Sequence, residues 1–253
     1  MSSSVLAVQL YTVRDHTKTI SVLRETLKKV AAIGYTAVQT AGFGPMKPQE
    51  IADAMAENGL AVVSTHGGWP RFLNEIDAVI EEHKMLRCKH PAIGALAPEF
   101  NGLDGLKRFL DELGPVAERL AAEGMDFSYH NHSHELVRHG EKTWLEALYE
   151  QAPASSLKAE IDTYWIQHGG ENPAEYIRKY ANRAPLIHLK DMLGDEQKTF
   201  AEVGNGILDW PAIFKASEAA GAKWYIVEQD RCQRPPLESV KISFENLKKM
   251  KVV

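Results

Sequence analysis

Short apolar runs alternate with longer amphipathic stretches along the whole chain. The short runs are rich in Val, Ile and Leu, which is typical of strands. The longer stretches repeat apolar residues at helical spacing, as with Ile20, Leu23 and Leu27. The predicted strands are Val5–Tyr11, Ala37–Thr40, Leu60–His66, Ala92–Leu96, Asp126–His132, Leu157–Asp162, Leu186–Lys190 and Trp224–Glu228. The predicted helices are Thr19–Ala32, Pro48–Asn58, Leu73–Leu86, Leu103–Ala122, Thr143–Gln151, Pro173–Tyr180, Trp210–Ala220 and Ser239–Met250.

This alternation favours a parallel sheet that is covered by helices. The predicted strands are too apolar to alternate cleanly, which indicates that both of their faces are buried. Eight strand–helix units close most economically into a barrel, and the chain has the usual length of one. The competing doubly wound sheet lacks support, because no G-x-G-x-x-G motif follows the first strand. We therefore predict an α/β fold, a (β/α)8 TIM barrel that forms one domain over residues 1–253.

Composition and charge limit the kinds of partner that the protein is expected to bind and the cellular compartment in which it is expected. The chain is 44% hydrophobic with a net charge of −5, and no basic block stands out, so we expect no nucleic-acid partner. No apolar run reaches the roughly 18 residues of a membrane span, so we expect no membrane partner. The opening segment Met1–Gln9 lacks the features of a signal peptide, and the cysteines, Cys88 and Cys232, form no paired motif. These observations predict a cytoplasmic protein, for which assembly into a homo-oligomer stays open.

Polar residues fall where the predicted strands end. The carboxyl ends of the strands of a TIM barrel meet at one mouth, so residues that are distant in sequence come together there. The residues at these positions are His66, His130, His132, Asp162, His188 and Glu228. A mixed set of imidazole and carboxylate groups suits one divalent ion such as Mn, Co, Zn, Fe or Ni, with Mg as a further option. Taken singly, Asp162 could instead cap the following helix, and His188 could be a core histidine.

Several motifs together carry a family resemblance. They are Gln9–Arg14, Tyr129–His132 with Glu135, Glu160–Trp165, His188–Asp191, Val203–Gly206 and Val227–Asp230. With them the chain resembles the xylose-isomerase-like TIM barrels, the sugar phosphate isomerase/epimerase group. The resemblance implies a metal held by Glu, Asp, His and Glu at the ends of the last four strands. Asp162, His188 and Glu228 match, and His130 stands where many relatives carry a glutamate.

The fifth predicted strand departs from that family pattern. His130 and His132 have the same strand parity, so both should face the mouth. We expect one of them to bind the metal, with His130 the preferred ligand, and the other to move protons. Glu228, His132 and His66 are the candidate bases. The loss of one glutamate puts in doubt an epimerisation that uses two metal-bound glutamates on opposite faces of a carbon.

The resemblance implies a carbohydrate enzyme. We expect a divalent-metal-dependent isomerase or epimerase that acts on a sugar, keto-sugar or related polyol through an enediolate. A dehydratase or lyase acting on a keto-polyol or 3-keto-glycoside is the alternative. An apurinic-site endonuclease would need a basic face, and a non-catalytic sugar-binding barrel would need no metal cluster. Expected substrate contacts are Glu135, Lys190, Trp69 and Trp165, although such tryptophans are often rim packing and such a lysine can be solvated.

Overall fold

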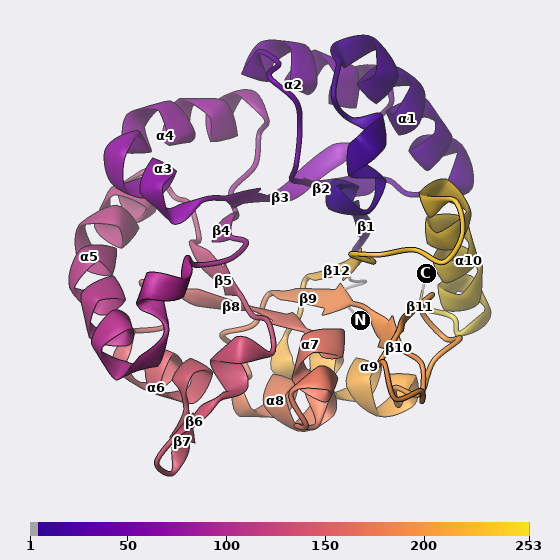
Figure 1. Cartoon of the computed structure of the whole chain (residues 1–253). Helices are drawn as coiled ribbons and strands as arrows, with labels where there is room; N and C mark the ends of the chain where they lie inside the picture. Colours follow the sequence, from indigo (N-terminus) through magenta and orange to yellow (C-terminus); the bar gives the residue numbers. More distant parts are fainter. Residues whose placement is uncertain (1–4, 253) are drawn as a thin grey trace.

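The computed structural model describes residues 5–252, so Met1–Ser4 of the opening segment lie outside the described residues. Eight parallel strands close into a barrel in the order β1-β12-β9-β8-β5-β4-β3-β2 (Figure 1). They are β1 (Val5–Gln9), β2 (Ala37–Thr40), β3 (Ala61–Gly67), β4 (Pro91–Ile93), β5 (Ser128–His130), β8 (Lys158–Asp162), β9 (Leu186–Leu189) and β12 (Trp224–Val227). Strand β1 pairs with β2 on one side and with β12 on the other, so the predicted TIM barrel is confirmed.

Amphipathic helices surround the barrel and bury their apolar faces against it. In α5, for example, Leu106, Phe109, Leu113 and Leu120 lie on the buried face. The helices are α1 (Ile20–Ile33), α2 (Pro48–Glu57), α3 (Trp69–Asn74), α4 (Ile76–Met85), α5 (Gly102–Ala122), α6 (Trp144–Gln151), α7 (Thr163–His168), α8 (Pro173–Lys179), α9 (Trp210–Ala220) and α10 (Pro236–Lys249). Among the described residues, no helix combines the length and apolarity that crossing a membrane requires.

The boundaries of several elements differ from the prediction. The predicted helix 73–86 is two helices, because the backbone of Glu75 leaves the helical region at φ −133° and ψ 31°. Strand β1 ends at Gln9 and continues as a 3-10 helix, η1 (Leu10–His16). Strand β5 ends at His130, so the chain leaves the barrel two residues before His132. Two further 3-10 turns, η2 (Pro98–Phe100) and η3 (His134–Leu136), lie in loops at the mouth.

Two short hairpins extend the loops after β5 and β9. The first pairs β6 (Arg138–His139) with β7 (Lys142–Thr143), and the second pairs β10 (Asp191–Met192) with β11 (Phe200–Ala201).

The second hairpin is organised around the buried carboxylate of Asp191. Its oxygens accept hydrogen bonds from the backbone N–H groups of Met192, Gly204, Gly206 and Leu208 and from the indole of Trp210. A Cβ atom at position 206 would lie 2.2 Å from Asp191 Oδ1, so only glycine fits there. The segment Val203–Gly206 therefore closes a loop around Asp191.

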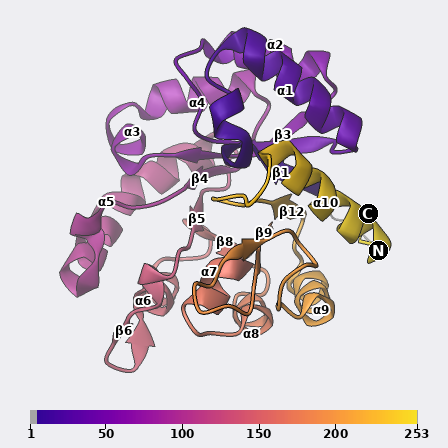
Figure 2. The same cartoon turned by 45° about the vertical axis from the view of Figure 1, so that its right-hand side comes forward.

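The C-terminal helix seals the junction between the first and last strands. Helix α10 packs against α1, η1 and β12 (Figure 2). The Tyr35 hydroxyl donates to the carbonyl of Val240 at 2.8 Å, and the rings of Tyr35 and Phe244 meet edge to face. Gly34 leaves room for Phe244, since a Cβ atom there would lie 2.5 Å from that ring.

Candidate functional site

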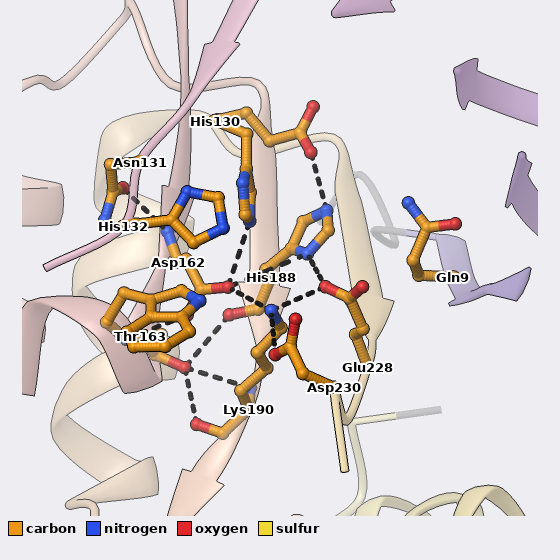
Figure 3. A network of polar contacts seen from close by, with 12 residues as sticks. Gln9, His130, Asn131, His132, Asp162, Thr163, His188, Lys190, Glu228 and Asp230 are labelled. Atoms are coloured by element: carbon orange, nitrogen blue, oxygen red, sulfur yellow. Dashed lines mark hydrogen bonds and ion pairs between the residues drawn. The ribbon is translucent and has the colours of Figure 1, made fainter. Parts of the chain in front are cut away.

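The structure brings the four predicted metal ligands together at the mouth of the barrel. His130 ends β5, Asp162 ends β8, His188 lies in β9 and Glu228 follows β12 directly. One donor atom from each lies within 4.8 Å of the others, and all four side chains are buried. His130 Nε2 is 3.0 Å from Asp162 Oδ2, and His188 Nδ1 is 2.9 Å from Glu228 Oε2 (Figure 3). Strand ends distant in sequence thus form one His/Asp/Glu cluster.

Asp162 serves the fold and the cluster at the same time. Its Oδ1 caps α7 by accepting from the Trp165 N–H at 3.0 Å, while its Oδ2 faces His130. The Asn131 side chain accepts from the Asp162 N–H, so this backbone position is tied to the end of β5. The two interpretations of Asp162 from the sequence, helix cap and ligand, therefore do not exclude each other.

The donor set of this cluster fits a divalent metal ion. His130 Nδ1 lies 3.2 Å from the carbonyl of Gly94, and burial, followed by the neighbouring His188, holds the pKa of His130 well below its usual value. A neutral ring that donates from Nδ1 points its Nε2 lone pair at the Asp162 carboxylate, so two acceptors face each other unless a cation lies between them. His188 directs Nε2 at Glu160 Oε1 at 2.6 Å, the usual arrangement for a metal-binding histidine. His130, Asp162, His188 and Glu228 could therefore hold one ion.

Carboxyl groups surround the ring of His188. Nδ1 faces Glu228 and Nε2 faces both Glu160 and the side-chain oxygen of Gln39. Burial lowers the pKa of His188, but the charges and hydrogen bonds of Glu160 and Glu228 outweigh it and raise the pKa to about 10. The imidazolium form thus balances part of the negative charge of these carboxyl groups.

A second cation, Lys190, is enclosed in the same cluster. Its Nζ atom lies 2.9 Å from Asp162 Oδ2, 2.7 Å from Glu228 Oε2 and 2.8 Å from Asp230 Oδ2, and the side chain is fully buried. Burial lowers the pKa of Lys190, but these three carboxyl groups raise it well above its usual value. Three carboxylates thus contact the ammonium group, and substrate binding by Lys190 stays a prediction.

A layer of buried polar groups lies beneath the predicted ligands. Glu160 Oε1 contacts His66 Nε2 and His188 Nε2, each at 2.6 Å, and accepts from Gln39 Nε2 at 2.9 Å. Gln9 Nε2 donates to Gln39 Oε1 and lies 3.4 Å from His66 Nδ1. The sequence pattern alone assigns no role to Glu160, Gln9 or Gln39. Strand parity held a signal, because Glu160 lies two residues before Asp162 on the same face.

His132 lies beside the cluster although it is outside β5. Its ring meets that of His130 at 4.8 Å and that of Trp165 at 5.2 Å. Its Nδ1 atom is buried and has no hydrogen-bond partner. Burial, followed by the charge of His130, lowers the pKa of His132 to about 3, so the value near 6.5 expected for a proton-transferring histidine is not retained.

The remaining predicted substrate residues differ in their surroundings. Trp69 lies in the core, where its ring packs on Phe109 and its indole donates to Glu112, so it forms no wall for a substrate. Glu135 is buried and accepts from Tyr129 and from the His132 N–H, so it holds the loop that carries His132. Trp165 remains beside the site, and its buried indole N–H has no partner.

A cavity of about 220 Å³ adjoins the site on the side of β2 and β3. His66 and Thr65 are among its polar lining residues, and Phe43, Met46 and Ile51 are among its apolar ones. His66 therefore connects the buried cluster, through Glu160, to an open space.

Comparisons with known proteins agree with this architecture. An inosose dehydratase from Geobacillus thermodenitrificans is 27% identical over 146 residues, 51% of this chain and 46% of the relative, so the match spans about half of that protein. An inosose dehydratase from Geobacillus kaustophilus is 24% identical over 89% of this chain and 86% of its own length. A sugar phosphate isomerase/epimerase structure from Parabacteroides distasonis superposes with a TM-score of 0.84 at 22% identity, covering 100% of this chain and 96% of that one, which shows the shared fold. The sequence profile of one family matches residues 27–250, and the chain belongs to that family, the xylose isomerase-like TIM barrels.

Proposed function

We propose that this chain is a divalent-metal-dependent lyase that dehydrates a keto-polyol or 3-keto-glycoside, with isomerisation or epimerisation of a keto-sugar as the second candidate. Both reactions begin when a base removes a proton from the carbon next to a carbonyl group. The sequence placed isomerisation first. The inosose dehydratases among the relatives support the lyase instead.

One observation carries the choice between the two reactions. An epimerase of the kind the family resemblance implies needs a carboxylate on each side of the reacting carbon. The end of β5 here carries His130, whose two ring nitrogens already face Gly94 and Asp162. Glu228 therefore has no carboxylate counterpart at β5. This asymmetry suits the removal of one proton followed by the loss of a hydroxyl group as water.

Each part of this chemistry is given to a group of the chain. A divalent ion held by His130, Asp162, His188 and Glu228 would polarise the substrate oxygens as a Lewis acid. His66 is the favoured base, because Glu160 orients its Nε2 atom at 2.6 Å while Nδ1 makes only a long 3.4 Å contact with Gln9. His66 takes the substrate proton at Nδ1, and its return to the leaving hydroxyl releases water. The free N–H of Trp165 supports a role in binding substrate oxygen.

Proton exchange and dehydration can be followed in one experiment. The protein is incubated in D2O with inososes, keto-sugars and 3-keto-glycosides, each with Mn, Co or Mg, and the products are identified by NMR. Loss of water together with deuterium at the carbon next to the carbonyl supports the lyase. Deuterium exchange with inversion or carbonyl transfer supports the second candidate. Exchange that persists in the chelated enzyme contradicts the metal dependence, and no exchange in any substrate contradicts both reactions.

A further inference from the structure

Lys190 and a metal ion would require the same carboxylate oxygens. Asp162 Oδ2 and Glu228 Oε2, the two carboxylate oxygens of the four-residue cluster, lie 2.9 Å and 2.7 Å from Lys190 Nζ (Figure 3). The same two atoms face His130 Nε2 and His188 Nδ1. An ammonium group and a divalent ion that share two oxygens are only a few ångströms apart, where like charges repel strongly in a protein interior.

The backbone holds Lys190 in this position. The Thr163 Oγ1 atom lies 2.9 Å from the carbonyl oxygens of His188 and Lys190, which share its single proton, and it accepts from the Lys190 N–H. Asp191, the next residue, is fastened by the loop described above. The main chain on both sides of Lys190 is thus anchored, and only its side chain is free to respond to an ion.

Asp230 offers the ammonium group a second position. Its carboxylate lies 2.8 Å from Lys190 Nζ but is outside the four-residue cluster, and its side chain is 24% exposed. If an ion took the oxygens of Asp162 and Glu228, Lys190 would keep Asp230 as a partner. A small rotation of the side chain would then replace one cation by another without leaving a buried charge unpaired.

We propose that Lys190 is a resident cation that competes with the metal ion for Asp162 and Glu228 and so sets how tightly the ion is bound. The inference rests on the metal site of the proposed function. In the ion-free protein Lys190 holds the carboxylates together, and on loading it retreats towards Asp230. The site would therefore exchange its ion more readily than its four buried ligands alone would allow.

Metal affinity tests the competition directly. Lys190→Met keeps the length of the side chain and removes its charge. Lys158→Met removes the same charge from the opposite end of β8 and serves as the control. Each protein is stripped with a chelator, and Mn²⁺ binding is measured by titration calorimetry at fixed pH and salt. We expect Lys190→Met to bind Mn²⁺ about tenfold more tightly or better, because a nearby like charge is removed. Lys158→Met should stay within about twofold of the unchanged protein, since its charge is distant and screened.

Thermal unfolding provides a readout that does not depend on activity. Stripped Lys190→Met should melt below the stripped parent protein, because its carboxylates lose their partner, and should gain more in Tm when Mn²⁺ is added. If the stripped variant does not fold, recovery of the fold by Mn²⁺ supports the proposal, and failure with Mn²⁺ moves the test to Lys190→Gln.

The outcomes separate this inference from the proposed function. Equal or weaker Mn²⁺ binding in the variants of Lys190 overturns the competition and makes the lysine a partner of the bound ion. Binding by Lys190→Met with none by the parent protein supports the competition but contradicts the metal dependence of the parent. No binding by either protein overturns both.

Discussion

Replacing Asp191 by Asn should destabilise the barrel strongly, although it only exchanges one side-chain oxygen for an NH2 group. The carboxylate is fully buried, and its Oδ2 accepts from Gly204, Gly206 and the Trp210 indole at 2.9, 3.1 and 2.7 Å. Its Oδ1 accepts from Met192 and Leu208 at 2.8 and 3.2 Å. Asparagine keeps one acceptor oxygen, and its NH2 group must face the donors on the other side.

The magnitude follows from the number of donors that lose an acceptor. The better orientation keeps the carbonyl oxygen at the Oδ2 position and leaves the N–H groups of Met192 and Leu208 unpaired. An unsatisfied buried donor costs about 1–3 kcal/mol, and the three remaining bonds lose the strengthening that a charged acceptor gives. We therefore expect Asp191→Asn to lower the free energy of unfolding by about 3–5 kcal/mol, a large share of a typical domain's stability.

Equilibrium unfolding in urea measures this change. The transition should be followed by both tryptophan fluorescence and circular dichroism, because coincident curves are needed for a two-state treatment. Asp209→Asn is the matched control: Asp209 is exposed and caps α9 by accepting from the Ala212 N–H, and asparagine caps a helix about as well. The control should change the free energy by less than about 0.5 kcal/mol. A loss below about 1 kcal/mol in Asp191→Asn would refute the reasoning.

Four further outcomes test the site and the chain. His130→Ala should lose bound metal and activity together, whereas His132→Ala should keep its metal, and equal metal loss in both would make both residues ligands. His66→Asn should keep its metal but lower kcat about 10²-fold, as expected for a lost base, and full activity would remove His66 from that role. Burial lowers the pKa of His83 from 6.5, so the unfolded state binds a proton that the folded state does not. The free energy of unfolding should therefore fall as the pH drops below about 6.5. His83→Gln should reduce the slope of this free energy against pH by up to about 1.4 kcal/mol per pH unit, and an unchanged slope would contradict the role of His83. No shift of abasic DNA is expected in a gel at submicromolar protein and physiological salt, because the net charge is −5, and a clear shift would favour the endonuclease alternative.

The barrel could be predicted from the sequence because its order depends on local patterns. A strand such as Leu186–Leu189 is buried on both faces, so its residues are apolar wherever they point. Polar residues at the ends of such strands, like Asp162, stand out against this background. The family profile and the closed sheet confirm the fold, while the roles of the individual site residues remain predictions.

The features that the sequence does not predict depend on contacts between residues that are distant in sequence. Nothing near Lys190 in the chain shows that its ammonium group is taken by Glu228 and Asp230, which come from the end of another strand. Trp69 looks like a loop residue until α5 brings Phe109 and Glu112 against it. Helix breaks such as Glu75 depend on backbone angles that the apolar pattern does not encode.

The closure of the barrel between β1 and β12 has a consequence for how the protein is made. Val5 pairs with Trp224 and Val8 with Val227, so the first strand of the barrel to be synthesised waits for the last strand of the barrel. Synthesis at about 5–20 residues per second leaves that edge open for roughly 10–40 s. During this time the edge of β1 that pairs with β12 has no partner within the barrel, and an unpaired apolar strand edge is prone to pair with other chains. Yield in a recombinant host should therefore respond to temperature and to chaperone supply during translation.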